Sequence, residues 1–165
     1  MRFEPLYYAE RLHIVNPEGD VGVATLWSQV EQVRKLLGEI GIDLDPRSSR
    51  VAVLANLYGN GFPQMLRNLL WNPQVRYLLA LGQDLSGSGR ELVNFFDRGL
   101  EEVEHLGAPA HRIAGTLRII DGSVTPADFS NGIRVTALGR IGDPDTARAV
   151  GSFFASLPPP SAPAR

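Results

Sequence analysis

The chain has 165 residues, 44% of them hydrophobic, and its 16 basic and 18 acidic residues give a net charge of −2. This length suits one ordinary domain with a substantial core, and a near-neutral charge without a block of one sign argues against a nucleic-acid-binding protein. The absence of cysteine excludes disulfides, thiolate metal sites and a cysteine nucleophile from this chain.

Two features of the sequence bear on its location. No apolar run approaches the roughly 18 residues of a membrane-spanning helix. The N-terminal stretch MRFEPLYYAER lacks the charged and then apolar layout of a signal peptide. We therefore expect a cytoplasmic protein that does not associate with a membrane.

Three β-rich runs, each followed by a helical pattern, occupy the chain up to about residue 107. The runs are residues 21–27, 51–57 and 75–82. Ser28 and Glu31 form a capping-box pattern at the start of the first helix, Pro63 suits the first turn of the second, and the third is predicted over residues 90–107. Continuous apolar strands suit a parallel sheet covered on both faces, and their alternation with helices suits right-handed crossovers. We predict an α/β fold, as a single Rossmann-like domain with a mostly parallel sheet and helices on both faces.

The C-terminal third of the chain is less regular. It predicts two strands, at residues 112–120 and 133–139, and a final helix after Asp143. The single domain is predicted to span residues 1–157. Residues 158–165 form a proline-rich tail, which we predict to be disordered because it cannot bury enough apolar surface.

Two glycine-rich loops follow the second and third predicted strands, YGNGFP at residues 58–63 and DLSGSGR at residues 84–90. Ligands of open α/β sheets bind beyond the carboxyl ends of the strands, and glycine lets backbone N–H groups approach an anion closely. Arg90 opposes the helix macrodipole, which a bound anion would explain; a solvated Arg90 offset by Glu91 is the alternative. The candidate ligand-binding residues are Asn56, Tyr58, Gly59, Gly61, Asp84, Ser86, Gly87, Ser88, Gly89 and Arg90.

Neither loop matches a standard nucleotide motif. Ser88 stands where a phosphate loop has its lysine, and Leu92 stands where the dinucleotide fingerprint has its last glycine. Glycines that make tight turns and helix caps are therefore the alternative to a ligand site. Asp84 is predicted either to orient a ribose or heterocycle or to cap the following turn. The histidines are scattered and no nucleophile–base pair is evident, so we assign no metal ligand and no catalytic residue.

The segment NPQVRYLLALGQDLSGSGRELVNFFDRG, residues 72–99, resembles a known pattern. It is similar to the corrinoid-carrying subunit of tetrahydromethanopterin S-methyltransferase and to a related uncharacterised domain found beside thymidylate synthases or pterin-binding modules. The matching residues are Asn72, Pro73, Val75, Arg76, Tyr77, Leu78, Gly82, Gly87, Gly89 and Gly99. The resemblance implies a Rossmann-like fold and one-carbon metabolism on a reduced pterin or folate. The methyltransferase subunit holds its corrinoid through a histidine, where this chain has Ser86-Gly87-Ser88.

From the loops and the resemblance we expect a protein that binds an anionic small molecule, either a nucleotide phosphate or a reduced pterin or folate. It would act in one-carbon or deoxynucleotide metabolism, as a one-carbon transferase if it is an enzyme. A corrinoid-carrying methyl-transfer subunit and a non-catalytic interaction subunit are the alternatives. A homodimer or a partner enzyme of one-carbon metabolism is expected. Without cysteine the chain cannot act as a thiol-dependent thymidylate synthase on its own.

Overall fold

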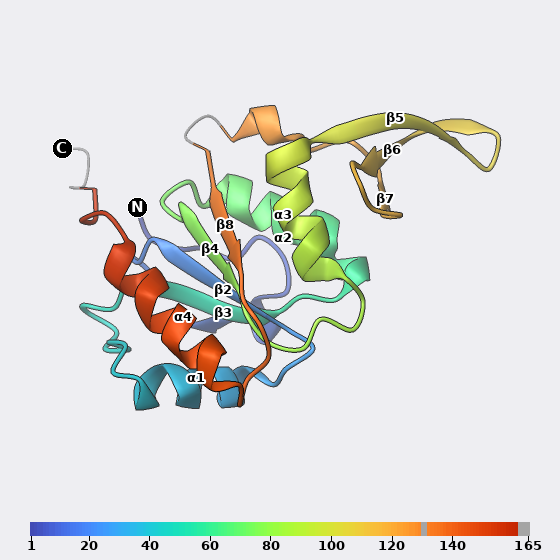
Figure 1. The fold of residues 1–165 in the computed structure, drawn as a ribbon. Helices are drawn as coiled ribbons and strands as arrows, with labels where there is room; N and C mark the ends of the chain where they lie inside the picture. The colour runs from blue at the N-terminus through green and yellow to red at the C-terminus, as the bar shows by residue number, and fades with distance from the viewer. Residues whose placement is uncertain (130–131, 162–165) are drawn as a thin grey trace.

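A five-stranded sheet forms the centre of the computed structural model, which describes residues 1–129 and 132–161. The strands lie in the order β1-β3-β2-β4-β8 (Figure 1). Their bounds are β1 (His13–Ile14), β2 (Val21–Leu26), β3 (Val51–Asn56), β4 (Tyr77–Ala80) and β8 (Arg134–Ala137). β3, β2, β4 and β8 pair in parallel, and the short β1 pairs antiparallel with β3. The predicted α/β fold with a mostly parallel sheet is confirmed.

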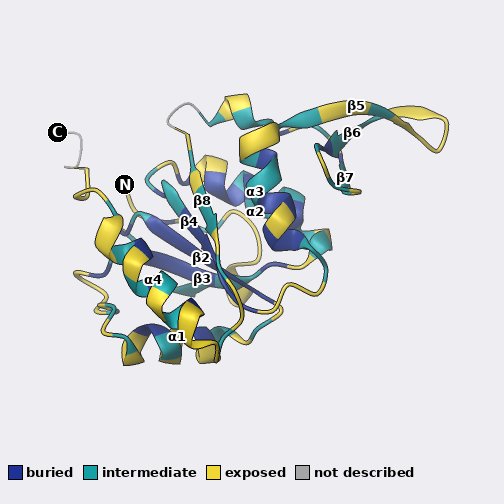
Figure 2. Cartoon of the chain, in the orientation of Figure 1, coloured by how far each residue is buried: buried dark blue, intermediate teal, exposed yellow. Residues whose placement is uncertain are grey.

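Different helices cover the two faces of this sheet (Figure 1). The α-helices of the described residues are α1 (Val30–Glu39), α2 (Phe62–Trp71), α3 (Ser88–Arg98) and α4 (Pro144–Ser156). α1 and α4 pack on one face, where Leu37 and Phe153 join the core. α2 and α3 pack on the other, around Phe62 and Phe95. All residues of β2 are buried, and Figure 2 shows the buried residues gathered along the central strands.

A second sheet, not predicted from the sequence, lies between α3 and β8 in the chain. It consists of β5 (Leu100–His105), β6 (Ala108–Ile113) and β7 (Ile119–Ile120), in the order β5-β6-β7, and both pairings are antiparallel. The helix predicted over residues 90–107 is wrong beyond Arg98, because Gly99 adopts a φ of 78° and the next residues pair as a hairpin. The strand predicted at residues 112–120 is interrupted by a turn at Gly115, whose φ is 75°.

β5 and β6 form a ribbon that extends away from the five-stranded sheet (Figure 1). Its tip is the two-residue turn Leu106-Gly107, with φ values of 52° and 78°. Positive φ at both positions matches the twist that a tight hairpin requires. Leu106 is 94% exposed, so the ribbon ends in an apolar side chain surrounded by solvent.

A single Rossmann-like domain over residues 1–157 stays a prediction. In the proline-rich tail, the carbonyl of Pro158 accepts a hydrogen bond from Arg50 Nη1 (2.5 Å), whereas residues 162–165 lie outside the described residues. Each helix in the described part of the chain is too short or too polar to cross a bilayer.

Candidate functional site

The loops of interest lie at the carboxyl edge of the five-stranded sheet. From β2 the chain passes through α1 to β3 on one side, and from β3 it crosses through α2 to β4 on the other side of β2. The winding therefore reverses at β2, and the loops after β2 and β4 leave the sheet in opposite directions. Ligands of open α/β sheets bind in the crevice at such a switch point.

The loop after β2 is held in a strained conformation. Leu26 is 2% exposed and has a φ of 53°, in the left-handed region that bulky residues rarely adopt. The Nδ2 group of Asn56 donates to the carbonyls of Leu26 (2.9 Å) and Ser28 (2.7 Å). Ser28 Oγ accepts a hydrogen bond from the Gln83 N–H (2.9 Å). The predicted helix cap at Ser28 is therefore wrong, and this side chain joins the loops after β2 and β4 instead.

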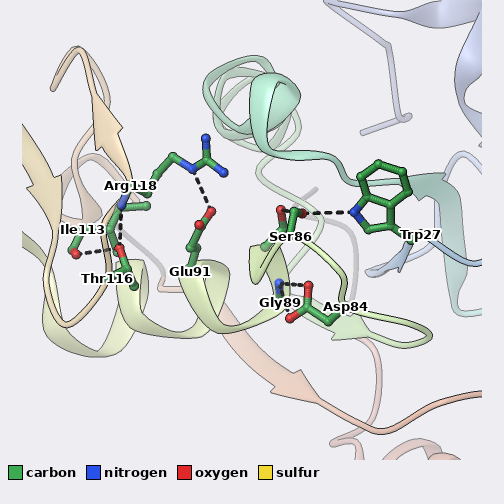
Figure 3. A network of polar contacts seen from close by, with 9 residues as sticks. Trp27, Asp84, Ser86, Gly89, Glu91, Ile113, Thr116 and Arg118 are labelled. Atoms are coloured by element: carbon green, nitrogen blue, oxygen red, sulfur yellow. Dashed lines mark hydrogen bonds and ion pairs between the residues drawn. The ribbon is translucent and has the colours of Figure 1, made fainter.

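An exposed aromatic pair connects three loops at this edge. The rings of Trp27, after β2, and Tyr58, after β3, lie 4.6 Å apart with an interplanar angle of 59°, and they are 45% and 43% exposed. Trp27 Nε1 donates to Ser86 Oγ (3.1 Å), and Ser86 Oγ lies 2.9 Å from Ser88 Oγ (Figure 3). The serine loop after β4 is thus fixed against an indole ring whose face stays open to solvent.

The start of α3 already has an anion bound to its backbone. Both carboxylate oxygens of Asp84 accept from the N–H of Gly89, at 3.2 and 3.1 Å (Figure 3). A negative charge at this position is favoured by the helix macrodipole. Asp84 therefore takes the capping role, one of the two predicted for it. Ser88 is fully buried, so this loop is a packed helix start rather than an open cradle.

The sequence pointed to Arg90, whereas the fold brings a different arginine, Arg118, to this edge of the sheet. Arg90 is exposed, and its Nη2 donates to the carbonyl of Gly115 (3.3 Å). Glu91, next to it, is 7% exposed and pairs with Arg118 (Nε to Oε2, 2.9 Å) (Figure 3). The predicted offset of Arg90 by Glu91 is therefore replaced by an ion pair to Arg118. A Cβ on Gly59 would lie 2.8 Å from Arg118 Cζ, so the guanidinium packs against that glycine.

A cavity of about 690 Å³ opens beside these loops. It lies between α2, the sheet and the N-terminal segment of residues 3–12. Small residues of β2 and β3 leave room above the sheet, namely Gly22, Ala24 and Ala55. The lining residues with polar groups are Tyr8, Arg11, Asn56, Tyr58, Asn60 and Asn68. The cavity is therefore mostly apolar, with a few hydrogen-bonding groups directed to it from several elements.

Asn68 of α2 and Asn72, the residue that follows this helix, hold the N-terminal segment over the cavity. Asn68 Oδ1 accepts from the N–H groups of Leu6 (2.8 Å) and Tyr7 (2.9 Å), and Asn68 Nδ2 donates to the Tyr7 carbonyl (3.1 Å). One turn later, Asn72 Oδ1 accepts from the N–H of Glu4 (2.7 Å) and Asn72 Nδ2 donates to its carbonyl (2.8 Å). Asn68 and Asn72 thus bind both N–H and C=O groups of the N-terminal segment's backbone.

The fold distributes the candidate residues over adjoining surfaces. The cavity is lined by Asn56, Tyr58 and Gly61. The loop before α3 contains Asp84, Ser86, Gly87, Ser88 and Gly89. Trp27 joins these two groups through its contacts with Tyr58 and Ser86, whereas Arg90 lies apart from them on Gly115.

Three residues at this edge were not found from the sequence, namely Trp27, Asn68 and Arg118. Trp27 directly follows a buried strand at its carboxyl end, and this placement is a signal that could have found it. Asn68 and Arg118 carry no such signal, because their roles depend on which distant segments pack against α2 and α3.

The described residues contain no group of three or more His, Cys, Asp or Glu side chains that could hold a metal ion. His13 lies on β1, His105 on β5 and His111 on β6, and none of the three is among the cavity-lining residues. The side chains described at this edge include asparagines, the aromatic pair of Trp27 and Tyr58, and arginine.

Comparisons with known proteins assign no family to this chain, so its function has to be inferred from the geometry of the site. The segment over residues 72–99, on which the resemblance rests, contributes β4, the serine loop and α3. No protein-family model matches the chain, and no curated protein matches it either.

Proposed function

We propose that this chain is a Rossmann-like domain that binds a small, planar, anionic metabolite of the pterin, folate or nucleotide class. The observation that carries this proposal is the cavity of about 690 Å³ over the face of β2 and β3, beside the loop that follows β3. Ligand pockets of drug-sized molecules have volumes of roughly 300–1,000 Å³ and combine apolar walls with a few polar groups. The volume and lining of this cavity match that description.

The preference for a planar ligand rests on the aromatic pair. Tyr58 lines the cavity and Trp27 packs on Tyr58, so a flat heterocycle finds a stacking surface at the rim. The side-chain amide of Asn60 offers both a donor and an acceptor, as the edge of a pterin or pyrimidine ring requires, whereas the amide of Asn68 is engaged by the N-terminal segment. The Nδ2 of Asn56 is engaged by the loop after β2, which leaves its Oδ1 for a ligand.

The metabolic class rests on the resemblance of residues 72–99 to methyl-transfer and pterin-associated proteins. If the chain is an enzyme, a one-carbon transferase agrees best with these residues. It would act by holding two reactants in position rather than by forming a covalent intermediate, and positioning alone contributes as much as about 7–11 kcal/mol to a barrier.

A thermal-shift screen tests the proposal. The ligands are a pterin, a reduced folate, deoxyuridine and thymidine monophosphates, and cobalamin. A ligand at 100 times its Kd adds about 2.7 kcal/mol to the free energy of unfolding, a shift of roughly 5–10 °C for a chain of this size. Tyr58→Ala should reduce that gain by about 1–3 kcal/mol through lost stacking, whereas Trp71→Ala, at an exposed aromatic residue of α2 outside the cavity lining, should not. The absence of a shift with every pterin, folate and nucleotide would contradict the proposal.

The corrinoid alternative needs a histidine that reaches the cobalt. The described histidines belong to β1 and to the β5–β6 ribbon rather than to the cavity lining or the serine loop. Cobalamin therefore stays in the screen as a comparison ligand, and the proposal does not extend to it.

Protein binding through the β5–β6 ribbon is the second candidate function. A two-stranded ribbon alone is marginally stable in water, yet this one extends from the domain (Figure 2). Leu106 at its tip is exposed. Glu101, Glu102 and Glu104 lie on its outer strand β5 and disfavour edge-to-edge pairing of two copies, so a contact would use the tip. If two copies associate through it, Leu106→Asp should convert a dimer to a monomer in light scattering; an unchanged mass would exclude that contact.

A further inference from the structure

Arg118 is held beside the cavity in an orientation that leaves the end of its guanidinium available. Its Nε donates to the buried Glu91 (2.9 Å), and its side chain is 25% exposed. Its backbone is fixed as well, since the Arg118 N–H donates to Thr116 Oγ1 (3.1 Å) and Thr116 Oγ1 donates to the Ile113 carbonyl (2.8 Å) (Figure 3). The turn between β6 and β7 is therefore a rigid support for one arginine.

The Nη1 and Nη2 groups of Arg118 donate no hydrogen bond to any residue within 1–129 and 132–161. A guanidinium presents its donors as a planar fork that matches the oxygens of a carboxylate or a phosphate. Glu91 binds the Nε side of this fork, and Nε is the one Arg118 side-chain atom that a dashed line joins to Glu91 in Figure 3. The fork is thus oriented by one anion and open to a second.

The open end of the fork lies next to the cavity. The Arg118 guanidinium packs so closely on Gly59 that a Cβ there would collide with it. The neighbours of Gly59, Tyr58 and Asn60, both line the cavity. The first residue of α2 is Phe62, so the positive end of that helix dipole faces the same turn. A negative charge held here would meet both the arginine and the helix start.

We propose that Arg118 binds the phosphate or carboxylate of the ligand whose planar part occupies the cavity. The proposal rests on the proposed function and identifies the residue that selects anionic ligands. The anion is thus placed at Arg118 rather than at the start of α3, where Asp84 already supplies a negative charge. The proposal also assigns no anion to Arg90, whose Nη2 is engaged by Gly115.

The competing cation at the cavity is Arg11. Its side chain is 73% exposed and contacts Glu10 at 3.9 Å, and its guanidinium lies over the ring of Tyr8. A mobile, solvated arginine must lose side-chain entropy before it holds a ligand. Arg118 has already lost that freedom through its ion pair, which is why we assign the anion to it.

The test measures inorganic pyrophosphate binding by titration calorimetry at constant ionic strength, so that it does not depend on the cavity ligand. Arg118→Gln should weaken binding roughly 10- to 100-fold, the effect of losing hydrogen bonds to a charged group, and Arg118→Lys should restore only part of it because it lacks the fork. Arg112→Gln is the matched control: Arg112 also pairs with a glutamate, Glu101 (2.6 Å), in the same antiparallel sheet. Arg112→Gln and Arg90→Gln should bind pyrophosphate as the wild type does, whereas a loss of binding in Arg11→Gln rather than in Arg118→Gln would overturn the assignment.

Removal of Arg118 alone leaves the buried Glu91 carboxylate without its partner, so the double variant E91Q/R118Q serves as a neutral counterpart if Arg118→Gln does not fold. Pyrophosphate binding that is absent in the wild type, or equal in the wild type and the double variant, would overturn the proposal.

A second arm separates this proposal from the proposed function. The wild type should bind thymidine monophosphate roughly 10- to 100-fold more tightly than thymidine, and the double variant should bind the two equally. If pyrophosphate binding depends on Arg118 but none of the pterins, folates or nucleosides binds, the proposed function fails and the anion site stands. If the metabolites bind with no dependence on Arg118, the proposed function stands and the assignment of the anion to Arg118 fails.

Discussion

Gly82 is the single residue on which the contact between the loops after β2 and β4 depends most directly. Its φ is 120°, and a Cβ there would lie 2.6 Å from both the Thr25 carbonyl oxygen and Ser28 Oγ. Backbone conformation and space therefore both require glycine. The same Ser28 hydroxyl accepts the hydrogen bond that ties the loop after β2 to the loop after β4, so a side chain at this position would separate the two loops.

Gly82→Ala should lower the free energy of unfolding by about 2 kcal/mol or more. The cost of the positive φ and the collision of the new Cβ with the Thr25 carbonyl both contribute to this loss. Urea denaturation measures it. Gly151→Ala is the matched control, since Gly151 lies inside α4 and its Cβ would meet no atom within 4 Å; it should stabilise by about 0.5–1 kcal/mol. Equal stability of Gly82→Ala and the wild type would show that the loops do not need this conformation.

Asp121 makes the folding stability of the chain depend on pH in the acid range. The N–H and hydroxyl of Ser123 and the guanidinium of Arg67 lower the pKa of Asp121 from its ordinary value of 3.8 to about 2. Because the folded pKa lies below the unfolded one, the unfolded state binds more protons between these values, and stability rises with pH. The contribution is present above about pH 4 and is lost as the pH falls towards about 2. The side chain is 57% exposed, so solvent screening keeps the contribution small.

Asp121→Asn should therefore lose less stability than the wild type when the pH falls from about 4 to about 2. Thermal unfolding at the two pH values measures this difference. Identical losses in both proteins would show that the hydrogen bonds to Asp121 do not persist in solution.

For single residues, the sequence indicated which side chains could bind a charged group better than it indicated which groups they contact. Asp84 takes one of its two predicted roles, since its position before a helix start limits the groups that its carboxylate can bind. The role of Arg90 was assigned on the helix dipole alone, whereas in the structure it is Arg118 that pairs with Glu91 and is held in a fixed orientation. No pattern near Glu91 indicates a partner 27 residues later, because that contact exists only once the turn between β6 and β7 has folded back onto α3.

Among the elements, α2 both forms a wall of the cavity and holds the segment that covers it. Asn68 is 7% exposed and makes three hydrogen bonds to the backbone of Leu6 and Tyr7. Asn68→Ala should cost about 1–3 kcal/mol, the range for buried polar groups that lose a partner. It should also speed hydrogen exchange at the N–H groups of Leu6 and Tyr7.

Asn60→Ala is the control for that change, because Asn60 lines the same cavity but forms no hydrogen bond to the N-terminal segment among the described residues. Exchange at Leu6 and Tyr7 should be unchanged in this variant. If Asn68→Ala leaves the exchange rates as they are, other contacts hold the segment, and Asn68 is not its anchor.

The parallel strands and most helices could be predicted because local signals determine them. Residues 21–27, 51–57 and 75–82 are apolar almost throughout and form β2, β3 and β4. The antiparallel sheet could not, since LEEVEH at residues 100–105 has little apolar character of its own and becomes a strand by pairing with β6. The helix predicted to continue through Gly99 is wrong for this reason. The glycine ends α3, and pairing with β6 determines the structure of the residues after it.

At the scale of the whole molecule, two features extend beyond a plain α/β unit. One is the cavity between α2 and the sheet, which exists because small residues stand on β2 and β3 and the N-terminal segment spans the gap. The other is the β5–β6 ribbon, whose base provides Arg118 and whose tip exposes Leu106. The insertion between α3 and β8 thus completes the proposed site at one end and offers a contact surface at the other.

The most direct test of the central claim, that this edge of the sheet binds a planar metabolite, uses the fluorescence of the two tryptophans of the chain. Trp71→Phe leaves Trp27 as the reporter, and Trp27→Phe leaves Trp71, which lies at the end of α2 and is 59% exposed. Titration with a pterin, a reduced folate and thymidine monophosphate should quench Trp27 saturably in Trp71→Phe and leave the emission of Trp27→Phe unchanged. No saturable change in Trp71→Phe with any of them, or a change confined to Trp27→Phe, would contradict the claim.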